Sequence, residues 1–517
     1  MRKFIVLLLL LGMFMSLTPH HDTRAQDNPF KAEWFNDAIM YEIFVRSFRD
    51  SDGDGIGDLQ GVIDSLDYIQ SLGANTIWLM PVHPSPSYHG YDVSDYYEIN
   101  PDYGTLTDML TLIDEAHKRD MHIILDYVAN HTSTFHEFFQ DAYDNPDSDY
   151  SGFYKWADED HTSYQSFAGV SGMPEVNYDN EFARQYMIDV ARFWLDPNGD
   201  GDPSDGVDGL RCDVAIGPPL SFWREVRSAV LEINPDALLL GEVWLPSSLQ
   251  LLDYLQGDAF NAVFDFPTFD TLVADHNANG DGAVSGQAPS EWIGLSLRGG
   301  ERLYPSGAHL VRFINNHDTN RLMSEVEGDW ERAKAAAAWL YTAPGTPMIY
   351  YGEEIGMFGS KGESGFYDEY RREPMDWFRT GRGDEMTTWF RPGDRYNLSN
   401  DGVSVEEQDD DPASLLNLYR MLGEFRKQTP AMRGSYGGVD LSSSSSDLYT
   451  AWRGDLAGDF AFVVINFSTQ TITTSLDDDE FPVNDLNEMD MAFSEGFALD
   501  GSDFTIEPAG YAVFLSR

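Results

Sequence analysis

Three acidic residues, each at the end of a short apolar run, carry most of the chemical information in this sequence. Asp213 closes Gly-Leu-Arg-Cys-Asp, Glu242 follows Leu-Leu-Leu-Gly, and Asp318 ends Phe-Ile-Asn-Asn-His-Asp. A carboxylate at the carboxyl end of a buried strand lies where a (β/α)8 barrel builds its active site. Carboxylates from separate strands suit cleavage of a glycosidic bond, because one can attack while another protonates the leaving oxygen. With Arg211 and His317 beside them, we interpret the three acids as a catalytic group and not as helix caps.

The elements that must position these acids form an alternating pattern. Eight strand-like runs are separated by amphipathic helical segments, which predicts an α/β fold with a parallel TIM barrel. The runs lie at residues 39–45, 76–80, 122–127, 209–213, 237–242, 259–265, 310–315 and 347–351.

Two segments depart from this alternation. The connection after the third run is too long for a plain loop, so we expect an inserted subdomain at residues 132–180. The catalytic barrel would then occupy residues 26–131 and 181–430. After a serine-rich stretch at 440–447, further strand-like runs predict a C-terminal antiparallel β-sandwich at residues 431–517.

The N-terminus has the pattern of an export signal. Arg2 and Lys3 precede an apolar run from Phe4 to Met15, and Ala25 closes a plausible cleavage site. We therefore expect a signal peptide at residues 1–25 and a secreted or periplasmic protein. The single cysteine, Cys212, cannot form an internal disulfide, and strand alternation directs it into the barrel wall as a packing residue.

The formal net charge of −54 restricts the partners of the protein. Nucleic acid and anionic membrane surfaces would be repelled, whereas a neutral substrate and bound cations are compatible with this charge. We expect no membrane association after signal cleavage, and a monomer. A salt-rich habitat and a solubility-driven acidic surface both explain the charge, and composition does not separate them.

Several motifs together resemble the α-amylase family of glycoside hydrolases (family 13), over nearly the whole mature chain. They occur in the family's order and include a motif late in the inserted segment and one at the final strand: Asp126-Tyr-Val-Ala-Asn-His131, Met173-Pro-Glu-Val-Asn177, Gly209-Leu-Arg-Cys-Asp213, Gly241-Glu-Val-Trp244, Asn315-Asn-His-Asp318 and Gly345-Thr-Pro-Met-Ile-Tyr-Tyr-Gly-Glu-Glu354.

The resemblance implies a role for each acid. Asp213 would be the nucleophile, Glu242 the general acid/base, and Asp318 a third acid that holds the distorted sugar. The nucleophile must stay ionised, and Arg211 would lower its pKa by favouring the charged form. The acid must keep its proton near neutrality, which burial and nearby carboxylates promote.

Further residues are candidates for binding the reacting sugar. His131 and His317 suit donors to sugar hydroxyls, and Arg321 matches a family position that contacts the same subsite. Tyr91 would be the aromatic platform, because the C–H face of a sugar stacks on an aromatic ring. Gly90 beside it would permit a close approach of the ligand.

The segment from Asp50 to Asp58 predicts a cation site. It places carboxylates at alternate positions around glycines, a spacing that lets one loop surround a hard cation with oxygen ligands. The resemblance implies Ca²⁺, for which we expect as ligands Asp50, Asp52, Asp54, Asp58 and the carbonyl of Ile56. Two looser acidic stretches, 196–205 and 275–281, are either ion sites or solvated loops.

Some positions depart from the classical α-amylases. Ile216 and Gly217 stand where those enzymes often have Lys-His, which puts a second calcium site in doubt. The segment from Arg372 to Trp377 resembles a motif of the oligo-1,6-glucosidase group, whose arginine pairs with the acid at the position of Asp92. Such a pair would close the non-reducing end of the cleft. By contrast, Ser87 to Asp92 resembles α-amylases intermediate between the oligo-1,6-glucosidase and neopullulanase groups.

We expect an enzyme with retaining chemistry, most simply an α-amylase acting on α-1,4 bonds of starch and maltooligosaccharides. An exo-acting α-glucosidase or oligo-1,6-glucosidase is the first alternative, supported by Asp92, Arg372 and Val214. A transglycosylase is the second, because a sugar can intercept the glycosyl-enzyme. A non-catalytic binding protein of the same fold is the third, and the presence of all three acids disfavours it.

Overall fold

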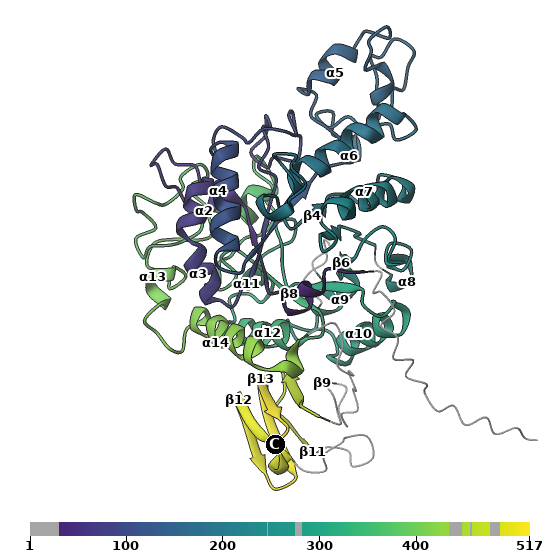
Figure 1. Ribbon diagram of the computed structural model, residues 1–517. Helices are drawn as coiled ribbons and strands as arrows, with labels where there is room; N and C mark the ends of the chain where they lie inside the picture. Colours follow the sequence, from purple (N-terminus) through teal and green to yellow (C-terminus); the bar gives the residue numbers. More distant parts are fainter. Residues whose placement is uncertain (1–29, 246, 275–281, 434–446, 455–457, 476–485) are drawn as a thin grey trace, which may run out of the picture.

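The computed structural model describes residues 30–245, 247–274, 282–433, 447–454, 458–475 and 486–517. The expected signal peptide, the serine-rich stretch at 440–446 and the acidic stretch at 275–281 lie outside these residues. The long segment after the third strand projects from the barrel at the top of Figure 1, and the C-terminal sheet lies at the bottom. No helix in the described part of the chain is long and apolar enough to cross a membrane.

Eight parallel strands close into a barrel, in which each pairs with the next and β8 returns to β1. This confirms the predicted TIM barrel and all eight strand-like runs. The strands are β1 (Met40–Ile43), β2 (Thr76–Leu79), β3 (His122–Tyr127), β4 (Gly209–Cys212), β5 (Leu238–Gly241), β6 (Ala262–Phe264), β7 (His309–Arg312) and β8 (Thr346–Tyr350).

Helices connect these strands and cover the barrel (Figure 1). They are α1 (Val45–Phe48), α2 (Leu59–Asp64), α3 (Leu66–Ser71), α4 (Leu106–His117), α5 (Glu137–Ala142), α6 (Glu181–Leu195), α7 (Leu220–Ile233), α8 (Ser248–Leu251), α9 (Phe266–Leu272), α10 (Glu291–Leu303), α11 (Leu322–Glu325), α12 (Trp330–Thr342), α13 (Val405–Gln408) and α14 (Leu415–Gln428).

Side-chain hydroxyls and carboxylates fix where several helices begin. Thr105 and Asp108 form a capping box at α4, and Asp58 caps α2 by accepting from the N–H of Gly61. Such caps satisfy backbone donors that have no partner inside the helix. The α2 cap matters for the site, because it anchors the far end of the Asp50–Asp58 loop.

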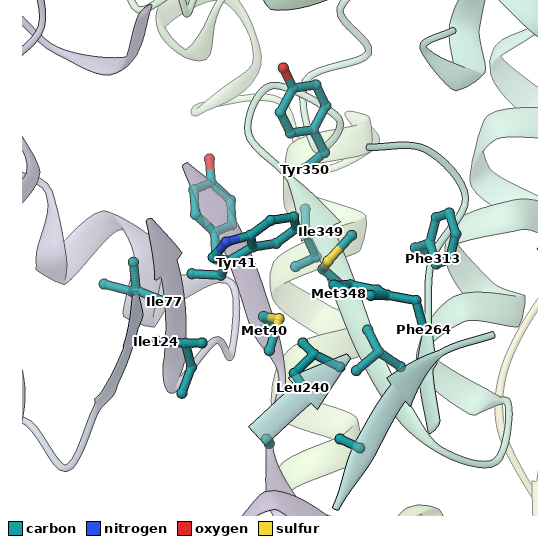
Figure 2. Packing of buried hydrophobic residues seen from close by; sticks show 14 of the residues in the cluster. Met40, Tyr41, Ile77, Ile124, Leu240, Phe264, Phe313, Met348, Ile349 and Tyr350 are labelled. Atoms are coloured by element: carbon teal, nitrogen blue, oxygen red, sulfur yellow. The ribbon is translucent and has the colours of Figure 1, made fainter. Parts of the chain in front are cut away.

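The barrel interior is a packed apolar core. Met40, Leu240, Phe264 and Met348 come from different strands and converge there, as Figure 2 shows. A filled interior leaves no space for ligand between the strands, so a ligand must bind at the strand ends. Cys212 is fully buried in this wall, in agreement with its predicted packing role.

The segment between β3 and α6 contains α5 and two short 3-10 helices, and it is held together by isolated β-bridges such as His131–Glu175 and Tyr154–Val176. The core of this segment is a cluster of aromatic side chains, and little regular secondary structure surrounds it. Phe139, for example, contacts Tyr154 and Trp156. This segment therefore keeps a fixed shape beside the carboxyl ends of the barrel strands.

The C-terminal strands form an antiparallel sheet, as expected. The described residues form one sheet of five strands, in which β13 pairs with β10, β11 and β12. These strands are β9 (Leu448–Gly454), β10 (Phe460–Asn466), β11 (Ile472–Ser475), β12 (Asp490–Asp500) and β13 (Asp503–Leu515). The sheet packs against α10 and α12 of the barrel, away from the strand ends that carry the acids.

Candidate active site

The three acids meet in one cleft. Asp213 directly follows β4, Glu242 directly follows β5, and Asp318 lies in the loop after β7. All three line a cleft of about 360 Å³ at the carboxyl ends of the strands. The parallel barrel produces this convergence, because every strand delivers its carboxyl end to the same face.

A single buried guanidinium holds the acids in place. Arg211 donates from Nη1 to Oδ1 of Asp213 at 2.7 Å and forms an ion pair from Nη2 to Oε1 of Glu242 at 2.8 Å. It also donates to Asp126 of β3 at 3.0 Å. Three carboxylates thus share one cation, an arrangement in which the acids cannot all be ionised at low cost.

The shared cation and the burial set the pKa values. Burial raises the pKa of Glu242 to about 7, against the opposing effect of Arg211. Burial also raises the pKa of Asp213 to about 7, although Arg211 lowers it. The expected effect of Arg211 on Asp213 is therefore present but is outweighed by burial, and the net shift is opposite to our prediction. Near neutral pH the carboxyl groups of Asp213 and Glu242 can therefore share one bound proton as a coupled pair.

Hydrogen bonds distinguish the two acids. The second oxygen of Asp213, Oδ2, is buried and has no hydrogen-bond partner among the described residues. In contrast, Oε2 of Glu242 accepts from the backbone N–H of Val214 at 2.8 Å. Val214 has φ +42°, which is strained for a β-branched residue, and such strain is concentrated at functional sites. Asp213 keeps a free oxygen, whereas Glu242 is held at both of its oxygens.

His317 and Asp318 form a charged pair beside these acids. Nε2 of His317 lies 3.2 Å from Oδ2 of Asp318, and Nη2 of Arg372 lies 2.9 Å from Oδ1. Burial alone would raise the pKa of Asp318, but His317 and Arg372 hold it well below its usual range. Asp318 therefore remains an ionised acceptor, with about half of its side chain (51%) exposed to the cleft.

His131 and Tyr91 also line the cleft. The His131 ring stacks on Phe167 with centroids 5.0 Å apart, and its Nε2 has no hydrogen-bond partner among the described residues. Burial lowers the pKa of His131 to about 3, so the ring is neutral. Gly90 has φ +83°, and an added Cβ would lie 2.9 Å from the carbonyl oxygen of Pro81, so the turn that presents Tyr91 requires glycine.

Four of the expected substrate residues do not line the cleft. His317 is one of them and is 0% exposed. Arg211 lies beneath Tyr91 and supports the acids from below the cleft. Asp92 is buried and accepts from the hydroxyl groups of Ser85, at 2.6 Å, and Ser87. Arg321 is fully buried and donates to the carbonyl groups of Arg371 and Tyr351 at 2.9 and 2.7 Å. This placement corrects the prediction that Arg321 contacts the sugar.

The resemblance to the oligo-1,6-glucosidase motif implied an ion pair between Arg372 and Asp92. Arg372 does line the cleft, but it pairs with Asp318, while Asp92 is satisfied by serine hydroxyls. No ion pair joins Arg372 to Asp92 in the structure described here. The expectation of that pair is therefore wrong.

Sequence reasoning missed several residues of the site. The apolar part of the cleft lining includes Phe167 and Met173 from the inserted segment, and Trp244 and Phe266 from the loops after β5 and β6. Below the cleft, Asp126 and Glu42 are fully buried carboxylates within β3 and β1. A charged residue inside an otherwise apolar strand was the signal for these two, because a buried charge needs a partner.

The Asp50–Asp58 loop brings three carboxylates together. Oxygens of Asp50, Asp52 and Asp58 lie within 4.8 Å of one another, a donor set that fits a hard cation. Gly53 and Gly55 have φ values of +84° and +96°, and both donate N–H groups to Asp50 at 2.7 Å. Asp54 is outside this group and accepts from the N–H of Ile56 at 2.8 Å.

The second acidic stretch, 196–205, differs from this loop. Asp196 there accepts from the backbone N–H groups of Asp200 and Gly201 at 3.1 and 2.9 Å, which stabilises a turn. Among the described residues, the acids of this stretch do not form a group of three converging oxygens.

Comparison with known proteins agrees with this geometry. The family described as "Alpha amylase, catalytic domain" matches residues 42–435. Alpha-amylase 3 of Dictyoglomus thermophilum is 35% identical over 458 residues, which cover 85% of this chain and 86% of that protein. A probable oligo-1,6-glucosidase of Bacillus subtilis is 30% identical, over 78% of this chain and 86% of that protein.

A solved structure extends the similarity to three dimensions. The α-amylase of H. orenii superimposes with a TM-score of 0.78 at 32% identity, over 93% of this chain and 99% of that one. The barrel, the cleft and these matches lead to one conclusion: the chain belongs to the α-amylase family of glycoside hydrolases (family 13) and is an α-glucan hydrolase.

Proposed function

We propose that this protein is an α-amylase that cleaves α-1,4 bonds inside starch and maltooligosaccharide chains, with retention of configuration. One observation carries the choice of internal cleavage. Arg372 binds Asp318 and not Asp92, so the ion pair that would close the non-reducing end is not formed among the described residues. A cleft without this wall can accept a chain that continues beyond the reacting sugar.

The lining of the cleft supports an extended ligand. Besides Tyr91, four aromatic residues line the cleft together with the acids: Tyr88, Phe167, Trp244 and Phe266. Aromatic rings stack on the C–H faces of sugars, so several glucose units could be held at once. Trp244 is 44% exposed, and its surface is available for such a contact.

The proposed mechanism is a double displacement. Glu242 donates its proton to the glycosidic oxygen while Oδ2 of Asp213 attacks the anomeric carbon, which gives a glycosyl-enzyme and releases the leaving sugar. Glu242, now ionised, removes a proton from water, and the water attacks the anomeric carbon from the opposite side. Asp213 leaves as a carboxylate, and two inversions give net retention.

The remaining residues bind and orient the reacting sugar in this proposal. Tyr91 provides the stacking surface and His131 contacts hydroxyl groups, while the buried His317 binds Tyr91 and Asp318. Asp318, ionised and half exposed, accepts hydrogen bonds from hydroxyls of the distorted ring. Contacts that strengthen as the ring flattens stabilise the transition state more than the ground state.

An exo-acting α-glucosidase or oligo-1,6-glucosidase is the alternative. The motif around Arg372 and the similarity to the probable oligo-1,6-glucosidase of Bacillus subtilis favour it. Transfer of the glycosyl group to a second sugar is also compatible with the same covalent intermediate.

A product profile tests the proposal. Soluble starch and isomaltooligosaccharides are digested separately, and products are sampled from the first minutes. An α-amylase of the proposed kind lowers starch viscosity rapidly and releases mixed maltooligosaccharides. Glucose as the sole early product, or faster cleavage of isomaltooligosaccharides, would favour the alternative.

We further propose that Asp50, Asp52 and Asp58 hold a Ca²⁺ ion, with the Ile56 carbonyl as an additional ligand. The ion would stabilise the loop between α1 and α2 and takes no part in the chemical steps. The net charge of −54 and the N-terminal sequence support an extracytoplasmic monomer that binds a neutral glucan.

A further inference from the structure

Glu42 is a buried acid for which the mechanism above has no role. It lies in β1, is 0% exposed and does not line the cleft. Its Oε1 lies 2.6 Å from Nδ1 of His317, and its Oε2 has no hydrogen-bond partner among the described residues. A buried carboxylate is costly unless it is paired, so the contact with His317 dominates its environment.

The other ring nitrogen of His317 faces the cleft side. Its Nε2 lies 2.8 Å from the hydroxyl of Tyr91 and 3.2 Å from Oδ2 of Asp318. The Tyr91 hydroxyl donates its own hydrogen to Oδ2 of Asp126 at 3.1 Å. It can therefore only accept from His317, and a carboxylate of Asp318 can only accept as well.

This pattern fixes where the protons are. Nε2 must carry a hydrogen to satisfy Tyr91 and Asp318, and Nδ1 must share a hydrogen with the carboxylate of Glu42. An imidazole with hydrogens on both nitrogens is a cation. The Glu42–His317 pair thus holds a proton that a neutral histidine would not have.

The charged groups around His317 favour the doubly protonated ring. Glu42 faces it from β1, Asp318 from its own loop and Asp126 from β3, while Arg211 lies under Tyr91 and Arg372 donates to the His317 carbonyl. Burial lowers the pKa of His317, but Asp318 and then Glu42 outweigh it and raise the pKa to about 9.

We propose that Glu42 is a positioning residue that keeps His317 doubly protonated, so that the imidazolium holds and orients Asp318 in alkaline as well as neutral solution. This inference rests on the proposed function, in which Asp318 binds the reacting sugar. Glu42 acts through His317 and touches no substrate itself.

The test replaces the charge and keeps the shape. Glu42→Gln retains an acceptor oxygen for Nδ1 but removes the negative charge that favours the imidazolium. The matched control is Glu354→Gln, because Glu354 is equally buried, accepts from Tyr41 and Tyr68, and has no contact with His317. For each variant, kcat and KM for a maltooligosaccharide are measured from about pH 5.5 to about pH 8, as ratios to wild type.

The kcat/KM of each variant is divided by that of the wild type at the same pH. This division cancels the pH dependence that comes from Glu242, because all three proteins contain it. At about pH 5.5 His317 is protonated in each protein, so the kcat/KM of Glu42→Gln should lie close to wild type. At about pH 8 only the variant has lost the proton, and its kcat/KM should be lower by roughly tenfold, about one pKa unit of displacement. Glu354→Gln should give a ratio that does not change with pH.

A ratio for Glu42→Gln that is constant with pH, whether near one or uniformly low, overturns the proposal and leaves Glu42 a structural residue. A second measurement needs no substrate and leaves Glu42 and His317 unchanged. His117 is the other described histidine with an acceptor at each ring nitrogen, the carbonyl of Ser204 at 3.1 Å and Oδ2 of Asp208 at 2.9 Å, so the measurement uses the His117→Gln variant. With ¹⁵N-labelled histidine in that variant, one ring, that of His317, should keep both N–H signals at about pH 8. Absence of such a ring also overturns the proposal, whereas inactivity on every glucan with that ring present would count against the proposed function alone.

Discussion

The guanidinium of Arg372 binds both Asp318 and the residue before it. It donates from Nη2 to Oδ1 of the side chain at 2.9 Å, and from Nε to the carbonyl of the preceding residue, His317, at 3.0 Å. Arg372 comes from the 3-10 helix at Asp368–Arg372, after the last barrel strand, and is itself buried. The loop that carries the third acid is therefore fastened by a residue more than 50 positions away.

This contact predicts the effect of removing the guanidinium. Arg372→Gln should lower kcat/KM by roughly 10- to 100-fold, because Asp318 loses both its cation and its orientation. The control is Arg420→Gln, which removes an ion pair with Asp409 on the far helix α14 and should leave kcat/KM unchanged. Wild-type kinetics for Arg372→Gln with maltooligosaccharides would show that the pair does not position Asp318.

The two central carboxylates should each be indispensable. Asp213→Asn removes the attacking oxygen anion and Glu242→Gln removes the proton donor, so each should lower kcat by roughly 10⁴-fold or more on starch. Circular dichroism and melting curves check that the fold survives. Glu354→Gln again serves as a buried carboxylate outside the cleft, and should keep most of the activity. A variant of either acid with near wild-type hydrolysis would refute the assigned roles.

The raised pKa of Glu242 predicts an alkaline limit. Burial places this pKa at about 7, and the first step needs the protonated acid, so kcat/KM should fall as the pH rises above about 7. At low pH the decline has another cause, because Asp213 becomes protonated and can no longer attack. Maltosyl fluoride needs no proton for its leaving group, so its rate of glycosyl-enzyme formation should lack the alkaline decline. An identical alkaline limb with this substrate would argue against Glu242 as the acid.

The proposed cation site predicts a stability effect. If Ca²⁺ binds only the folded protein, a chelator should lower Tm, and excess Ca²⁺ should restore it by mass action. Asp50→Asn should abolish the response to Ca²⁺, whereas Asp196→Asn, in the other acidic loop, should retain it. A Tm that is insensitive to both chelator and Ca²⁺ would exclude a calcium site that contributes to stability.

Most of the barrel could be predicted because its strands are short and apolar, and three of them are followed directly by an acid: Asp213, Glu242 and Asp265. Those features follow from burial on both faces and from the position of the site at the strand ends. The strand Asp490–Asp500 was not predicted, because none of its residues is fully buried and it contains Asp, Glu and Gly. Its pairing with Asp503–Leu515 is a tertiary feature that no local pattern encodes.

The residues of the site also fall into those that the sequence predicts and those that it does not. Asp213 and Glu242 were predicted because they end strands, Asp318 because it follows an apolar run, and His131 because it lies in a motif. The partner of Arg372 could not be predicted, because the choice between Asp92 and Asp318 depends on where two distant loops meet. Ser85 and Ser87 decide it by satisfying Asp92, and serine hydroxyls in a loop give no signal of such a role.

The most direct test of the double displacement is to trap its intermediate. Glu242→Gln is mixed with maltosyl fluoride, which forms the glycosyl-enzyme without an acid but then finds no base to activate water. After digestion with trypsin, the peptide Cys212–Arg224 contains a single acidic residue, Asp213. Mass spectrometry should find a maltosyl group on this peptide, and fragmentation should place it on Asp213. A label on another residue, or none while the variant still consumes the fluoride with retention, would contradict Asp213 as the nucleophile.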